Sequence, residues 1–197
     1  MGKVQTFEVT IKGAAPILMH NGRLADPLDP ATKALKVCTL KKPKTDDTHA
    51  DVARAEFIGS LYHHPVDGLY LPSSMIEAAL VDGAKRVKLG KAFKSCVFVD
   101  HDAPFTIGGE KKLLTPEQLW NAGIYRDTRG VVIGQKRIMR TRPMFPAGWT
   151  AKFSVTLMPD GGVDKAAISE AISVAGLFSG MGDFRPRFGR FTVEAFS

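Results

Sequence analysis

Three clusters of basic residues supply the groups in this sequence that could do chemistry. The first is GMGDFRPRFGR, residues 180–190, in which arginines stand among glycines and phenylalanines. Glycine lets a backbone amide approach a phosphate closely, guanidinium groups form paired hydrogen bonds to phosphate, and a phenylalanine ring can stack on a base. The segment therefore predicts a groove for a flexible polyanion, formed by Gly180, Gly182, Phe184, Arg185, Arg187, Phe188 and Arg190. The alternative is a helix end followed by a core strand, with the arginines paired to carboxylates.

The second cluster lies in GQKRIMRTRPMFP and contains Lys136, Arg137, Arg140 and Arg142. Strand alternation would place several of these side chains on one face. They are expected either to contact phosphates or to form a solvated sheet edge that is protected by charge.

The third cluster extends from Gly83 to Ser95, where five basic residues and no acidic one occur. Lys85, Arg86 and Lys88 are its candidates for phosphate contact, and a solvated helix end is the alternative. The chain of 197 residues has a net charge of +7 and a pI of about 9.5. This balance meets the electrostatic criterion for a nucleic-acid partner.

Catalytic candidates are few. His20 and Asn21 follow the apolar run PILM and are expected to contact nucleic acid. The imidazole of His20 could also lie at a strand end and act as the general base of a nuclease; a hydrogen-bonded structural histidine is the alternative. Asp26 and Asp29 flank Pro27 and are expected to shape turns. The sequence contains no HExxH, no phosphate-loop motif and no cysteine spacing typical of zinc. No metal, no cofactor and no enzymatic activity are therefore expected.

Length and hydropathy predict a folded, cytoplasmic protein. The 44% hydrophobic content is ordinary for one domain over residues 1–197. No run approaches the roughly 20 apolar residues of a membrane span, and the start, MGKVQTFEVTIKG, lacks the apolar core of a signal peptide. No membrane partner is expected.

Periodicity predicts alternating strands and helices. Strands are expected at residues 4–11, 68–72, 96–99, 104–107, 151–157 and 190–196, and helices at 49–62, 74–87, 116–121 and from a cap at Asp164 onward. Ser74 and Glu77 have the spacing of a capping box, and Gly90 is the expected terminator of that helix. A turn is expected at residues 160–162. Residues of about 22–66 and 108–148 are expected to be insertions, the first partly ordered and the second containing a β-hairpin.

The strongest elements follow the order strand, helix, strand, strand, helix, strand. This order is that of the ferredoxin-like arrangement, so we expect an α+β fold with an antiparallel sheet and two packing helices.

Two segments carry a resemblance to a known family. YLPSSMIEAALVDGAKR, residues 70–86, is similar to a pattern of strand, proline, small residues and a helix ending in arginine, and GLFSGMGDFRPRFGRFTV, residues 176–193, is similar to a glycine-rich loop that enters a basic strand. Together they resemble the repeat-associated RNA-binding superfamily (RAMP) that forms the backbone of CRISPR effector complexes. The resemblance implies an RRM-like core, a thumb-like β-hairpin within 108–148, side-by-side packing along single-stranded RNA, and a place for Ser73 and Ser74 in the binding site. The chain also looks like bacteriophage-encoded proteins, which is consistent with a stand-alone member.

We therefore expect a protein that binds the sugar-phosphate backbone of single-stranded RNA, in preference to single-stranded DNA, and self-associates along the strand. One rival is a metal-independent endoribonuclease of the same fold that uses His20 or a tyrosine. The other is a phage-encoded inhibitor or decoy that docks on a host nucleic-acid complex. Expected partners are nucleic acid, other copies of the chain, and host or phage nucleic-acid-processing proteins.

Overall fold

Alternating buried and exposed side chains build the central strand of the protein. In the computed structural model, which describes residues 2–108, 113–159 and 161–197, β1 (Gln5–Gly13) buries Phe7, Val9 and Ile11 on one face. It pairs antiparallel with β9 (Thr150–Leu157) on one side and with β10 (Phe191–Phe196) on the other. The strands predicted at both ends of the chain are therefore confirmed.

The main sheet has the strand order β10-β1-β9-β6-β4-β3, and β5 pairs with β9 beside it. The remaining strands of this sheet are short: β3 (His63–His64), β4 (Gly68–Leu71), β5 (Val97–Phe98) and β6 (Ala103–Thr106). The four core strands lie in the order β10-β1-β9-β6, which is fourth, first, third and second along the chain. This is the strand order of a ferredoxin-like sheet. The predicted α+β class, its antiparallel sheet and its ferredoxin-like core are confirmed.

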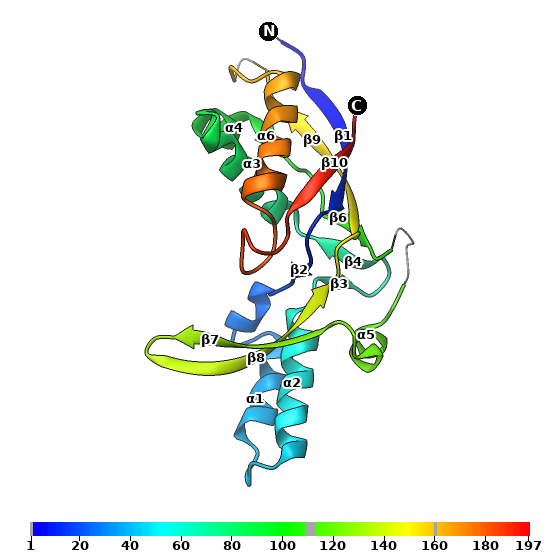
Figure 1. The fold of residues 1–197 in the computed structure, drawn as a ribbon, viewed down its shortest axis with the longest axis vertical. Coiled ribbons are helices and arrows are strands. Elements are labelled where there is room, and N and C mark those ends of the chain that lie inside the picture. Colours follow the sequence, from blue (N-terminus) through cyan, green and yellow to red (C-terminus); the bar gives the residue numbers. More distant parts are fainter. Residues whose placement is uncertain (1, 109–112, 160) are drawn as a thin grey trace. The chain divides into compact units, whose positions relative to one another are not determined.

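Two helices, α3 (Ser73–Arg86) and α6 (Lys165–Phe178), pack against each other beside this sheet (Figure 1). Their apolar faces are buried: Ile76, Leu80 and Ala84 in α3, and Ile168, Ala171, Ile172 and Ala175 in α6. The side chain of Asp164 caps α6 by accepting a hydrogen bond from the amide of Ala167 (2.8 Å), as predicted.

The start and the end of α3 differ from the prediction. Its N-cap residue is Pro72, which offers no side-chain hydrogen bond, so the prediction of a Ser74–Glu77 capping box is wrong. Instead, Asp102 accepts a hydrogen bond from the amide of Ser73 (2.8 Å), and Glu77 accepts one from the amide of Val99 (2.8 Å). Both carboxylates are thus engaged by distant residues, which no local pattern reveals.

The prediction that Gly90 ends this helix is also wrong. The helix α3 ends at Arg86, and Gly90 begins a further short helix, α4 (Gly90–Cys96). Between the two helices Lys88 has a φ of 64°, so the chain turns there without glycine.

The chain divides into two compact units. Unit 1 comprises Met1–Ile17, His64–Leu113 and Phe145–Ser197, and unit 2 comprises Leu18–His63 and Leu114–Met144. Unit 2 is thus formed by segments that overlap the insertions predicted at 22–66 and 108–148. The turn predicted at 160–162 lies partly outside the described residues, because Asp160 is not among them.

A helical hairpin and a β-hairpin make up most of unit 2. The helices are α1 (Pro30–Leu40) and α2 (Asp46–Ser60), preceded by a 3-10 turn at Gly22–Ala25. The strands β7 (Arg126–Ile133) and β8 (Lys136–Phe145) form the predicted β-hairpin, and β8 also pairs with β2 (Ile17–Leu18). A short helix, α5 (Pro116–Ala122), lies where one was predicted.

The helix α1 lies in the stretch that was expected to be only partly ordered. Asp29 caps it by accepting a hydrogen bond from the amide of Ala31 (2.7 Å), and Pro30 stands at its first position. Asp26 accepts a hydrogen bond from the amide of Leu28 (2.9 Å), which is the turn that was predicted there.

None of the helices in the described part of the chain is both long and apolar enough to cross a bilayer.

Candidate nucleic-acid interface

The loop of residues 179–190 joins α6 to β10, and its backbone is closed by internal hydrogen bonds. The amide of Gly180 donates to the carbonyl of Ala175 (2.8 Å), and the amide of Met181 donates to the carbonyl of Gly189 (3.0 Å). Gly180 and Gly189 have φ angles of 67° and 72°, and a Cβ at Gly189 would overlap the carbonyl of Met181. These two glycines therefore close the loop. The amide of Gly180, expected to face a phosphate, is instead bound to the carbonyl of Ala175 in α6, as in the helix-end alternative.

This loop, the end of α6 and the C-terminal half of α3 line an open cavity of about 640 Å³ in unit 1. The cavity is lined by Asp82, Arg86, Phe178, Ser179, Gly182, Asp183, Phe184, Arg185 and Pro186. Of the residues predicted from the sequence, the cavity brings together Arg86 from α3 and Gly182, Phe184 and Arg185 from the loop.

Asp82 connects the two sides of the cavity. Its carboxylate lies 2.7 Å from Nζ of Lys85 on the same helix and 3.3 Å from Nη1 of Arg185 in the loop. The hydrogen bond from Lys85 lowers the pKa of Asp82 below its ordinary value, and the positive charges of Lys85 and Arg185 act in the same direction against the opposing effect of burial. Asp82 therefore stays ionised at neutral pH and ties the loop to α3.

Two exposed aromatic rings border the cavity. Phe178, the last residue of α6, is 51% exposed, and the guanidinium of Arg86 lies 4.9 Å from the centre of its ring. Phe184 is 39% exposed. Rings with accessible faces beside cations are the surfaces on which bases of a single strand stack. Phe188, in contrast, is half-buried.

Four further cations are exposed but are not among the residues that line the cavity: Lys85 in α3, Lys88 just after it, and Arg187 and Arg190 in the loop. In the described part of the chain, Arg187 and Arg190 make no ion pair. The interpretation in which arginines pair with carboxylates thus holds for Arg185, while Arg187 and Arg190 keep their charge available to a ligand.

Ser73 and Ser74 lie at the opposite end of α3 from Arg86, about 20 Å away at the helical rise per residue. The amide of Ser73 is already bound to the carboxylate of Asp102. The structure therefore does not bring the two serines to the cavity.

In unit 2, the basic residues of β8 separate into two environments. Lys136 and Arg137 are exposed near the turn of the β-hairpin. Arg140 donates to the buried carboxylate of Glu56 (2.7 Å), and Arg142 is only 4% exposed. This favours a structural role for Arg140 and Arg142 and leaves Lys136 and Arg137 as the residues that a ligand can reach.

His20 and Asn21 also lie in unit 2. Asn21 accepts a hydrogen bond from the amide of Arg23 (3.0 Å) and donates one to the carbonyl of Leu61 (3.0 Å), so its side chain is occupied in holding local structure. His20 is exposed, and its carbonyl accepts a hydrogen bond from Oη of Tyr62 (2.9 Å). Within the described ranges, no three His, Cys, Asp or Glu side chains are grouped so as to hold a metal ion.

Sequence reasoning did not identify Asp82 and Phe178 as site residues. Asp82 has a local signal, because it stands three positions before Lys85 on one helix face, where an ion pair is expected. Its contact with Arg185 spans 103 positions and has no local signal. Phe178 resembles any other apolar residue of α6, and only its exposure distinguishes it.

Comparison with known proteins supports the fold. No family model and no curated protein matches the chain. A chain in the cryo-EM structure of the type III-B Cmr-beta bound to cognate target RNA is similar, with a TM-score of 0.55 and 13% sequence identity, over 99% of this chain and 60% of that chain. The crystal structure of Cmr6 from Pyrococcus furiosus has a TM-score of 0.44 and 11% identity, over 98% of this chain and 99% of that chain.

The protein spans about three fifths of the length of the Cmr-beta chain that it matches. At 13% identity, the similarity to the Cmr-beta chain concerns the fold alone. The chain therefore shares its fold with that Cmr-beta chain, as the resemblance of residues 70–86 and 176–193 implied.

Proposed function

We propose that this protein binds single-stranded RNA through its sugar-phosphate backbone, without cleaving it, and that the cavity of unit 1 is the principal contact. The observation that carries this proposal is the arrangement around one cavity of cations from two elements, Arg86 and Arg185, and of two exposed rings, Phe178 and Phe184. Arg187 and Arg190 in the same loop add charge for the neighbouring phosphates.

The ion pair with Asp82 prepares Arg185 for phosphate binding. A guanidinium has five N–H donors, and the bonds of Arg185 to Asp82 and to the carbonyl of Gly180 both use Nη1. Among the described residues no hydrogen bond uses Nε or Nη2, so these donors remain for a phosphate. Because the side chain is already held in place, less rotamer freedom is lost when the strand binds.

RNA is the proposed strand, and self-association along it is the proposed mode of assembly. The similar Cmr-beta structure contains target RNA, which supports this choice over single-stranded DNA. Light scattering of the protein mixed with oligouridines of increasing length tests assembly: the mass of the complex should rise in steps of one protein chain. A mass that stays at one chain per strand would exclude self-association.

The salt dependence of binding tests the cavity and its loop. Fluorescence anisotropy with a labelled oligouridine should show that Arg187→Ala and Arg190→Ala each weaken binding and reduce the slope of log K against log salt by about 0.7, the value for one phosphate contact on a single strand. Phe178→Ala should cost about 1–3 kcal/mol, the range for one base–ring stack.

Lys3→Ala is the matched control for the arginine variants, because it also removes one exposed charge in unit 1. Lys3 and the loop of residues 179–190 lie at opposite ends of β1. Lys3 precedes the strand, whereas the amide of Ala14, just after the strand, donates a hydrogen bond to the carbonyl of Arg190 in the loop. If both arginine variants and Phe178→Ala bind with the affinity and salt slope of Lys3→Ala, neither the loop nor the cavity is the interface and the proposal fails.

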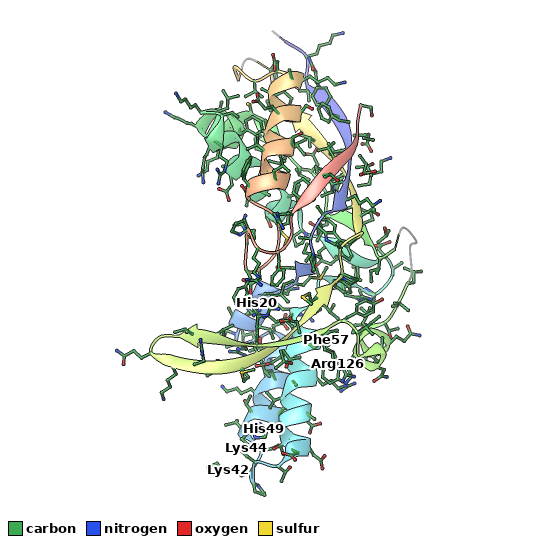
Figure 2. The ribbon with its side chains drawn as sticks, viewed as in Figure 1. His20, Lys42, Lys44, His49, Phe57 and Arg126 are labelled. Atoms are coloured by element: carbon green, nitrogen blue, oxygen red, sulfur yellow. The ribbon has the colours of Figure 1, made fainter. Side chains whose placement is uncertain are left out.

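One observation favours a second candidate function, a metal-independent endoribonuclease in unit 2. The hydrogen bond from Oη of Tyr62 to the backbone carbonyl of His20 brings a phenol to the backbone of a histidine whose side chain is exposed (Figure 2 labels His20). Such a pair could take the proton from a 2′-hydroxyl, so that its oxygen attacks phosphorus, and protonate the leaving 5′-oxygen. Cleavage of labelled RNA in a chelator, abolished in His20→Ala and in Tyr62→Phe, would establish this function. Intact RNA would eliminate it.

A further inference from the structure

The helix α1 has an outward face that unit 2 does not cover. No residue of α1 is buried, and Val37 and Leu40 are 63% and 70% exposed. Lys33 and Lys36 stand four positions before these two residues, so all four side chains lie on the same side of the helix. We name this surface of Lys33, Lys36, Val37 and Leu40 the α1 face. Exposed large apolar side chains among cations mark an interaction surface.

The charge on the α1 face itself is positive, and Asp29, Asp46 and Asp47 lie outside the face, before α1 and at the start of α2. Residues 30–44 contain five lysines and no acidic residue. Lys41 forms an ion pair with Asp51 (2.7 Å). Nζ of Lys44 donates a hydrogen bond to the carbonyl of Thr39, and this contact leaves the charge of Lys44 unpaired. In the described part of the chain, the side chains of Lys33, Lys36 and Lys42 make no ion pair. Figure 2 shows Lys42 and Lys44 at the end of the α1–α2 hairpin.

We propose that the α1 face is a docking site for an acidic, amphipathic helix of a partner protein. The apolar side chains of that helix would cover Val37 and Leu40, and its carboxylates would meet the flanking lysines. An apolar centre with a charged rim is the usual composition of a protein–protein interface. This inference does not depend on RNA binding by unit 1.

Charge argues against a second copy of the chain as the occupant. Two α1 faces packed antiparallel about a two-fold axis would place the Lys33 end of one helix opposite the Lys41–Lys44 end of the other. Lysines would then face lysines across the interface, and such like-charge contacts are unfavourable. An occupant with carboxylates removes this repulsion and pairs each lysine.

The apolar residues argue against nucleic acid as the occupant. Contact with a phosphate backbone needs the cations of the α1 face and leaves Val37 and Leu40 without a function. A protein helix covers both kinds of side chain at once, which is why it is the occupant that the whole surface fits.

Binding of a designed peptide to the full-length protein tests this inference. The probe is a fluorescein-labelled helical peptide with leucines at positions i, i+3, i+4 and i+7 and glutamates elsewhere, and its control has the same composition with the leucines dispersed. The first peptide should bind and the second should not. The double variant Val37→Ser/Leu40→Ser should bind the peptide about tenfold more weakly, or about 1.4 kcal/mol. Lys33→Gln/Lys36→Gln should weaken binding and reduce its salt dependence.

Ile124→Ser is the control variant, since Ile124 is 74% exposed and also belongs to unit 2. It should bind the peptide as the unaltered protein does, and the melting temperatures of all variants should agree because every altered side chain is exposed. Three results would overturn the inference. The first is no binding of the first peptide, and the second is equal binding of the dispersed peptide. The third is a combination: Lys33→Gln/Lys36→Gln lowers the affinity for oligouridine, and Val37→Ser/Leu40→Ser leaves peptide binding unchanged. The last result would assign the α1 face to nucleic acid.

Discussion

Replacing Glu56 by alanine should destabilise unit 2 far more than any change to the exposed cations of β8. The side chain of Glu56 is 8% exposed and accepts two hydrogen bonds from β8, one from Arg140 (2.7 Å) and one from the buried amide of Thr141 (2.9 Å). Without the carboxylate the amide has no acceptor, and an unsatisfied buried donor costs about 1–3 kcal/mol. The bond to Arg140 adds less than a fully buried pair, because the arginine side chain is 30% exposed and water can solvate it. We therefore expect a loss of about 3 kcal/mol.

Urea unfolding followed by tryptophan fluorescence measures this loss. Trp120 of unit 2 lies edge-on to Phe57, the neighbour of Glu56, with 5.4 Å between ring centres, so its emission reports on this region. Arg140→Ala should cost less than Glu56→Ala, since the amide of Thr141 keeps its acceptor. The double variant should show coupling, because the two residues are in direct contact.

Arg137→Ala is the matched control on the same strand, and an exposed substitution of this kind should change the free energy of unfolding by no more than about 0.5 kcal/mol. If Glu56→Ala and Arg137→Ala differ by less than that margin, the pair does not hold the β-hairpin to α2. The structural role of Arg140 would then be refuted, and Arg140 would return to the set of candidate phosphate contacts.

Three further predictions concern unit 1. The pKa of Asp82 is lowered in the folded protein, so its stabilising contribution is fully present above the ordinary aspartate pKa of 3.8 and is lost as the pH falls through the lower folded value. The variant Asp82→Asn should therefore lose less stability between neutral and acidic pH than the unaltered protein does, as measured by urea unfolding. Gly189→Ala should destabilise the protein by more than about 1 kcal/mol, because its φ of 72° and a nearby backbone carbonyl both exclude a Cβ; an unchanged melting temperature would show that the loop can rearrange. Asp164→Ala should cost about 1 kcal/mol by removing the cap of α6, and Asp164→Asn should recover most of it in the same assay.

Local patterns in the sequence predicted most of the helices and strands. The alternation of β1 and β9, the apolar stripes of α3 and α6 and the cap at Asp164 all depend on residues within one or two turns of each other, so they can be recognised without knowing the fold. The helix α1 had such a signal too, since Asp29 followed by Pro30 is the pattern of a capped helix start.

The ends of α3 show where local reasoning fails. Ser74 and Glu77 have the spacing of a capping box, but a carboxylate binds whichever donor the fold presents at the right distance. Here Glu77 accepts from Val99, 22 positions away, and Asp102 binds the amide of Ser73 across 29 positions. Neither partner can be read from the sequence around the helix.

The basic clusters were visible in the sequence, since charge and composition do not depend on folding. Which arginines remain available to a ligand was decided only by the tertiary structure. Arg185 meets Asp82 across 103 positions and Arg140 meets Glu56 across 84, whereas Arg187 and Arg137 stay exposed. The physical reason is that an arginine's function depends on whether a carboxylate lies within a few ångströms of it, and chain folding sets that distance between residues that are remote in sequence.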